Sequence, residues 1–326
     1  MSTIVEPELP AIVPPGDGPH TQELEQAYNL FCKELESSED WQDYGEQEGT
    51  QLYWKPDPED AYAVPTVKGE AVVPNATPDE FLAVLQLPGM RKRWDGRFQN
   101  GQILQRYNRH SYAFYTVMKG MGWLVWERDI VGAHKNYRSD GEIKVVQVSI
   151  EEPESAPVQD RKTRATLTVS GWQLQQQSDG SLKVTYVVKI ALNGSIPSAM
   201  VSKLAVEIPT CVGRAQKVFE TIGHAPYVLP TEDQPEPTVI FQTEGISDPT
   251  GYYMDQPGDL KYFCKFTTSA DGKFDLKYST KMYDGGVQAF VEGSSDAVEV
   301  TDDGNGTVHV KCNKADENVS VCIEPK

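Results

Sequence analysis

Residues 111–118 read SYAFYTVM and residues 128–137 read RDIVGAHKNY, and these two stretches decide the fold class. Side chains in both alternate between two faces with a period of two, as in strands of an antiparallel sheet. Similar segments surround them at residues 102–106, 142–150, 163–175 and 182–192. Hairpin turns are predicted at Asp140-Gly141 and Asp179-Gly180. This part of the chain is therefore expected to form an antiparallel meander.

Helical segments flank the predicted sheet on both sides. Thr21 is a candidate N-cap, and apolar residues at helical spacing make residues 21–37 an amphipathic helix. Thr77 and Pro78 open a second helix. After the sheet, an apolar stripe predicts a helix over residues 197–222 that Pro209 bends or interrupts. The order indicates an α+β helix-grip fold, in which a curved sheet grips the last helix and leaves space for an apolar ligand.

The C-terminal part of the chain has a different pattern. Short alternating segments recur beyond residue 237 with Gly-rich turns between them and no helical spacing, which favours a small all-β sandwich or barrel. A proline-rich acidic stretch precedes them and is typical of a linker. The expected organisation is a disordered lead-in, a helix-grip domain, a linker and a sandwich-like domain of unknown role, at residues 1–20, 21–228, 229–237 and 238–326.

Composition narrows the function classes. Residues 1–80 carry 3 basic and 18 acidic side chains, residues 81–230 carry 19 and 12, and residues 231–326 carry 8 and 18, within a net charge of −18. A basic middle between acidic ends does not favour nucleic-acid binding, but it suits an approach to anionic lipid headgroups. Five scattered cysteines, no signal core and no long apolar segment predict a soluble protein of the reducing cytoplasm.

Three short motifs occur in order along the middle of the chain. RWD stands at residues 93–95, WLVWERD at 123–129, and VTYVV at 184–188 is followed by GSIP at 194–197. In order and spacing they resemble the START family, the lipid-transfer domains related to steroidogenic acute regulatory protein. The resemblance implies a START-like fold for the helix-grip domain and one hydrophobic ligand (a sterol, phospholipid, fatty acid or isoprenoid) in an internal cavity, for transfer or sensing.

The chain also departs from the family pattern. The family's DxxG reads ALNG at residues 191–194, so the acid is missing. Sterol-binding members pair a buried acid with an arginine on the strand after RD, and the positions that correspond here are Tyr115 and His134. The resemblance thus implies a neutral polar pair as the anchor of the ligand, because such a pair meets a hydroxyl or carbonyl with little desolvation cost.

Further ligand-binding candidates follow from the predicted elements. Strand parity places three residues on the same inward face as the polar pair, namely Ala113, Val117 and Asn136, although a slip of one residue at a bulge would turn these positions outward. The penultimate strand contributes Tyr186. The last helix is expected to roof the cavity with a stripe that would serve equally as ordinary core, formed by Met200, Leu204, Ile208, Val212 and Phe219.

Three surface features allow more than one interpretation. Trp123 and Trp126 in a Gly-rich turn would suit transient membrane contact, or would pack inside the fold. The polar segment 151–160 would gate the cavity or simply join two strands. A basic cluster would steer toward headgroups or would be an ordinary solvated face, and it comprises Arg91, Lys92, Arg93, Arg97, Arg106 and Arg109.

Catalytic motifs are not apparent. The five histidines are far apart with no metal-ligand spacing, and there is no GxSxG elbow or phosphate-binding glycine loop. No metal, cofactor or nucleic-acid partner is expected, and the protein is predicted not to be an enzyme. Two alternatives stay open. One is a cyclase- or hydratase-like enzyme in which His134 and Tyr115 act as an acid–base pair, and the other is a scaffold without a ligand.

Overall fold

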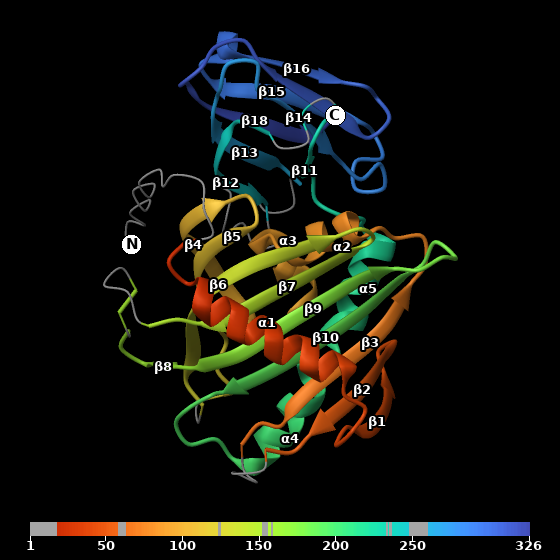
Figure 1. Cartoon of the computed structure of the whole chain (residues 1–326), viewed down its shortest axis with the longest axis vertical. Coiled ribbons are helices and arrows are strands. Elements are labelled where there is room, and N and C mark those ends of the chain that lie inside the picture. Colours follow the sequence, from red (N-terminus) through yellow and green to blue (C-terminus); the bar gives the residue numbers. More distant parts are fainter. Residues whose placement is uncertain are drawn as a thin grey trace.

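The computed structural model describes residues 18–57, 63–122, 125–151, 156–157, 159–232, 234, 237–247 and 260–326. These residues form a large sheet with helices on both faces and, above it, a smaller all-β domain (Figure 1). The predicted disordered lead-in lies almost entirely outside the described residues.

One sheet organises the first domain. Its strand order is β1 (Gln42–Gln47), β2 (Thr50–Lys55), β3 (Thr66–Val73), β10 (Leu182–Ala191), β9 (Thr166–Gln176), β7 (Glu142–Ser149), β6 (Glu127–Ser139), β5 (Ser111–Met118) and β4 (Phe98–Asn108). All of these neighbours pair antiparallel, and β8 (Lys162–Arg164) adds to β6 in parallel. The predicted meander is present, and the three N-terminal strands β1 to β3 extend the same sheet because β3 pairs with β10.

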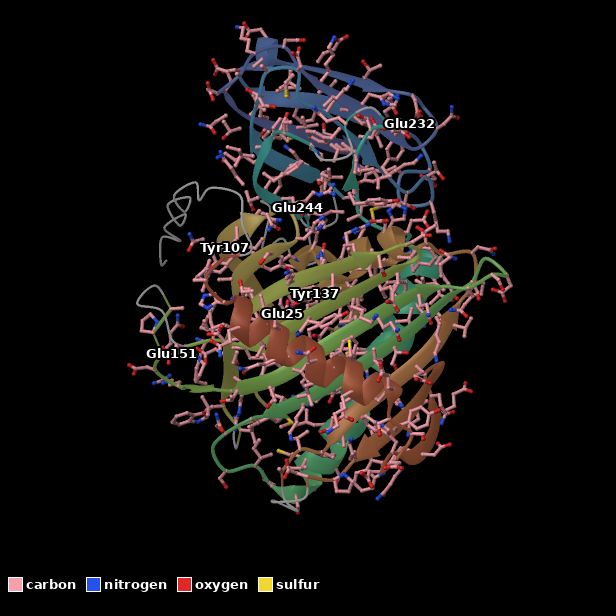
Figure 2. All side chains as sticks on the ribbon, in the orientation of Figure 1. Glu25, Tyr107, Tyr137, Glu151, Glu232 and Glu244 are labelled. Atoms are coloured by element: carbon pink, nitrogen blue, oxygen red, sulfur yellow. The ribbon has the colours of Figure 1, made fainter. Side chains whose placement is uncertain are left out.

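Helix α1 (Thr21–Glu36) lies across one face of this sheet, over β6, β7 and β9 (Figure 1). Phe31 is fully buried there, and a Cβ at Gly171 would come within 2.3 Å of its ring. Glycine at position 171 therefore lets the helix approach the sheet closely. At one end of the helix, Tyr137 donates a hydrogen bond to Glu25 at 3.2 Å (Figure 2). We call this side of the sheet the α1 face.

The other side, which we call the cavity face, carries four helices: α2 (Pro78–Leu85), α3 (Pro88–Trp94), α4 (Ser198–Glu207) and α5 (Cys211–Thr221). Thr77 and Glu80 form a capping box at the start of α2, in agreement with the sequence. The predicted last helix is divided into α4 and α5, and the break falls at Pro209, which lacks the N–H group that a continuous helix needs.

The C-terminal domain is a sandwich of two four-stranded sheets, as its alternating pattern predicts. One sheet has the order β11 (Tyr227–Leu229), β14 (Lys273–Lys277), β17 (Thr307–Cys312) and β16 (Val298–Asp302). The other has the order β12 (Ile240–Ile246), β13 (Tyr262–Thr267), β18 (Asn318–Pro325) and β15 (Val287–Gly293), and η1 (Ser295–Ala297) precedes β16. The aromatic core between them includes Phe241, Phe266 and Phe274.

The domain boundary lies earlier than the sequence indicated. Strand β11 begins at Tyr227 and pairs with β14, so it belongs to the sandwich. The predicted boundary leaves residues 227 and 228 in the first domain and residue 229 in the linker, because their short apolar run pairs only with a strand more than 40 residues further along the chain.

The two domains pack against each other through α3, β4 and β12. A Cβ at Gly89 would lie 2.0 Å from the Ile246 carbonyl oxygen, so the close approach of α3 to β12 requires glycine. Arg93 donates to the Ser247 carbonyl at 3.1 Å, and Glu244 lies at the same junction (Figure 2). Buried apolar residues of both domains form one continuous core across it.

Candidate ligand-binding cavity

A cavity of about 110 Å³ lies between the cavity face of the sheet and α4. We call it the START cavity, after the family that the motifs at residues 93–95, 123–129 and 184–197 resemble. Its apolar lining comes mainly from four strands, the segment after β10 and the α4 region, and includes Phe114, Ile130, Leu167, Val188, Ile190, Leu192, Leu204 and Ile208. Helix α4 therefore forms a roof, and a ligand below it would be surrounded mainly by hydrocarbon.

Polar groups lie along the part of the lining formed by β7, β9 and β10. Ser170 donates a hydrogen bond to the Tyr186 hydroxyl at 3.4 Å, and the Tyr186 ring stacks on Trp172 at a centroid distance of 3.9 Å. Burial raises the pKa of Tyr186, so the phenol stays protonated. Gln147 contributes an amide to the same lining. A ligand hydroxyl or carbonyl can be met here without an ionised group.

Two ion pairs lie among the charged residues of the cavity. Arg91 Nε donates to Asp95 Oδ2 at 2.9 Å, and Arg97 lies 3.0 Å from Glu207 Oε2. The second pair joins the residue before β4 to the last residue of α4. Cys211 is buried beside them, and burial raises the pKa of its thiol, which keeps it neutral.

One margin of the cavity is formed by the turn that includes Lys119, Met121, Val125 and Trp126. The Trp126 side chain is 59% exposed. Arg128 donates to the carbonyl oxygens of Trp126, Leu192 and Asn193 at 2.6, 3.2 and 3.0 Å, so one guanidinium ties this turn to the segment that leads into α4. Trp123 lies outside the described residues.

The predicted orientation of β5 is wrong by one residue. Phe114 and Thr116 line the START cavity, whereas three predicted residues lie on the α1 face, namely Ala113, Tyr115 and Val117. Tyr115 donates to Asp129 Oδ2 at 3.1 Å, and the same carboxylate pairs with Arg164 Nε at 3.0 Å. The tyrosine therefore supports a buried ion pair instead of facing a ligand.

The register of β5 with β6 explains this difference. Tyr115 pairs with Val131 and Tyr112 pairs with His134, so residues of like parity share a face. Tyr115 and His134 differ in parity and cannot lie on the same side. The long connection between the two strands hid this register from the sequence, since no tight turn sets it.

His134 and Asn136 lie on the cavity face but not in the lining of the START cavity. The His134 ring stacks on Tyr112 at 4.1 Å. Its Nε2 is 2.9 Å from Asn136 Oδ1, and its Nδ1 is 3.1 Å from the Gln147 amide nitrogen. Burial lowers the pKa of His134 to about 3, so the ring is neutral. A proton on Nε2 lets the ring donate to Asn136 and accept from Gln147, and the Gln86 amide nitrogen also lies 3.2 Å from Nε2.

Of the remaining candidates, Tyr186, Leu204 and Ile208 line the START cavity, and Met200 and Val212 are not among its lining residues. Val212 is fully buried in the core that spans the domains. Ligand contact by the lining residues stays a prediction. Glu207 and Cys211 also line the cavity but were not predicted from the sequence. They lie at the end of α4 and the start of α5, where the break at Pro209 interrupts the helical spacing.

The structure also bears on the other two surface features, the segment 151–160 and the basic cluster. Half of the predicted gate 151–160 lies outside the described residues, but Ala156 is buried and its carbonyl accepts from Arg164 at 3.0 Å. The basic cluster is not one surface, because Arg91 and Arg97 line the START cavity and Arg106 and Arg109 lie at the domain junction.

The described part of the chain holds neither a candidate metal centre nor a candidate membrane-spanning helix. No group of three or more His, Cys, Asp or Glu side chains there could hold a metal ion. No helix there is long and apolar enough to cross a membrane.

Comparison with known proteins places the first domain. A family model described as "START domain" matches residues 21–208. The human StAR-related lipid transfer protein 5 is 19% identical with a TM-score of 0.55, over 61% of this chain and 95% of that chain. Human STARD10 is 18% identical with a TM-score of 0.52, over 60% of this chain and 80% of that one. No curated protein sequence matches the chain.

At these identities the two solved structures support the fold alone. The family model covers more than half of the chain, including the sheet and the roof helix α4. The chain therefore belongs to the START domain family.

Proposed function

We propose that the protein binds one hydrophobic molecule in the START cavity and carries it between membranes or reports its presence. The observation that supports this most strongly is the apolar space between the sheet and α4 in a chain of the START family. Burial of apolar ligand surface there contributes roughly 25 cal/mol per Å² removed from water.

The lining favours a neutral lipid with a single hydroxyl or carbonyl, such as a sterol or an isoprenoid alcohol. Tyr186, Ser170 and Gln147 offer uncharged hydrogen-bonding groups. The Arg91 guanidinium is already paired with Asp95, so an ionised headgroup would have to displace a buried partner. A volume of about 110 Å³ also requires that α4 move outward to admit a whole sterol.

Exchange of the ligand requires the roof to open. The Arg97–Glu207 pair and the carbonyl contacts of Arg128 hold α4 and the segment before it against the sheet. Trp126, exposed beside Lys119 at the cavity margin, suits transient contact with an anionic membrane during opening. Five free cysteines support a cytoplasmic location.

Native mass spectrometry of the purified protein, followed by extraction of bound lipid, tests this function. The wild type is expected to carry one apolar adduct per chain. Leu204→Trp fills the cavity and should remove the adduct, whereas Ser202→Trp, on the exposed side of the same helix, should keep it. A bare wild-type mass after incubation with mixed lipid vesicles would overturn the proposal.

The proposed role contains no chemical step. Tyr115 and His134 lie on opposite faces of the sheet, so they do not form an acid–base pair. The separate test is turnover: conversion of the extracted lipid by wild-type protein, lost in His134→Ala, would show that the protein is an enzyme. An unchanged lipid after prolonged incubation is the expected result.

A further inference from the structure

A second and larger cavity lies where the two domains meet. Its volume is about 270 Å³, many times the 10–15 Å³ that one water needs. We call it the junction cavity. The START domain contributes α2, the end of β4 and part of β6, and the sandwich contributes β11, β12 and β13. The cavity therefore exists only because the two domains are docked.

The lining of the junction cavity is rich in arginine. It contains three guanidinium groups, from Arg106, Arg109 and Arg138, and two carboxylates, from Asp79 and Glu244. Arg138 pairs with Asp79 at 2.7 Å, and Arg106 lies 3.6 Å from Glu244. The positive groups exceed the negative ones by one.

Among these residues, Arg106 is nearly buried and has a donor without an acceptor. Its side chain is only 6% exposed, and the guanidinium lies over the Tyr112 ring at 5.4 Å. One terminal nitrogen donates to the Arg109 carbonyl at 3.3 Å. Its Nε is buried and has no hydrogen-bond partner among the described residues. A buried charged donor that lacks an acceptor is costly, and an anionic ligand would satisfy it.

The lowered pKa of His110 indicates that the junction cavity has a positive electrostatic potential. Its pKa is lowered to about 3, first by burial and then by the charges of Arg109, Arg138 and Arg106. The neutral ring lies with its Nε2 3.2 Å from an Arg109 terminal nitrogen and can accept a hydrogen bond from it. The space therefore disfavours a further cation and favours an anion.

A wall of side chains separates this cavity from the START cavity. His134 stands between them, with Gln147 of the START cavity on its Nδ1 side and Asn136 and Gln86 of the junction cavity on its Nε2 side. Tyr112 stacks on the ring and completes the wall. A ligand in one cavity does not reach into the other without displacing these buried groups.

We propose that the junction cavity is a second binding site, which takes a small water-soluble organic anion, a carboxylate or a phosphate ester with a short apolar body. Arg106 and Arg109 bind the anionic group through charge-assisted hydrogen bonds. The apolar body lies against residues that both domains supply, among them Leu82, Val228, Leu229 and Phe241. Because it contacts both domains, the anion stabilises their docking.

Titration calorimetry with hexanoate, hexyl phosphate and the uncharged hexan-1-ol tests the site in the full chain. One of the two anions should bind with a stoichiometry of one, and the alcohol at least about tenfold more weakly. Arg106→Met should weaken binding by about tenfold or more, whereas Lys135→Met should leave it within about twofold. Lys135 is on the same sheet but over Tyr137 on the α1 face, and its loss changes the net charge equally.

Arg138→Gln keeps the test decisive if Arg106→Met does not fold, because the Arg138 side chain is 33% exposed and its loss is better tolerated. This substitution should also weaken binding of the anion.

Leu204→Trp distinguishes binding in the junction cavity from binding in the START cavity. Unchanged hexanoate binding in that variant supports a separate anion, and its loss would mean that the probe enters the START cavity and would overturn the proposal. Equal binding of anion and alcohol, or no binding of either anion, would also overturn it.

Discussion

The two faces of β5 and β6 carry different residues and differ in role. On the α1 face, Tyr115, Asp129 and Arg164 form a closed network in which each charge has a partner. On the cavity face, Phe114, Thr116 and Ile130 border open space. Neighbours along one strand therefore differ completely in role. A substitution on the α1 face should alter stability, and one on the cavity face should alter ligand binding.

The largest expected effect is on the α1 face. Asp129 is fully buried, so Asp129→Asn leaves the Arg164 charge without its partner and should lower the free energy of unfolding by about 3–5 kcal/mol. Urea denaturation measures this loss. Asp140→Asn, at an exposed turn, is the control and should change little. The folded fraction of Asp129→Asn should still carry its ligand, and selective loss of ligand would contradict the division of roles.

The cavity face should show its own pH dependence. The pKa of His134 is lowered from 6.5 to about 3 in the folded protein, so the unfolded state binds more protons between these values. Stability is therefore full above about pH 6.5 and falls on acidification toward pH 3, on the order of 1.4 kcal/mol per pH unit from this group. Denaturation at several pH values should show a smaller slope in His134→Gln than in wild type.

His110 contributes to the same slope, because its pKa is lowered in the same direction. His309→Gln is the matched control, since its side chain is 54% exposed in the sandwich. If His134→Gln retained the full wild-type slope, the ring would not be buried and neutral as described.

A change in shape on the cavity face comes next. Phe114→Trp extends a lining side chain into the START cavity and should weaken the bound lipid about tenfold or more, at a cost in stability of about 1–3 kcal/mol. Displacement of a fluorescent sterol analogue measures the affinity. Hexanoate binding at the junction cavity should be unaffected, and a parallel loss of both ligands would show that the two cavities are not independent.

The smallest effect is expected at Tyr115. Tyr115→Phe removes one hydrogen bond to Asp129 and should cost about 1 kcal/mol of unfolding free energy. Lipid affinity in the same displacement assay should equal that of wild type, because the ring lies on the α1 face. Weaker lipid binding than in Phe114→Trp would reverse the assignment of the two faces.

Much of the fold could be predicted from local sequence. The period-two segments form strands, the Thr77–Pro78 signal begins α2, and Pro209 ends α4. Strand β1 was missed, because the residues of Gln42–Gln47 are nearly all polar and exposed and show no alternation of burial. Helix α3 was not predicted, because it has only 7 residues and Leu87 before it offers no side-chain cap, although Pro88 suits the first helical position.

The candidate site could be predicted less well. The roof residues Leu204 and Ile208 follow from helical spacing, but the inward residues of β5 depend on a register that no tight turn sets. A shift of one position exchanged Tyr115 for Phe114 and so replaced a polar anchor by an apolar wall.

By itself, then, the sequence determined the order of most strands and helices, the START motifs and the separate all-β domain. These features depend on residues a few positions apart, which share a strand or one face of a helix. Only the tertiary structure decided which residues of β5 face the START cavity, and that a second cavity exists at all. The junction depends on contacts such as Arg93 with Ser247, 154 residues apart. Packing across such distances leaves no periodic signal along the chain.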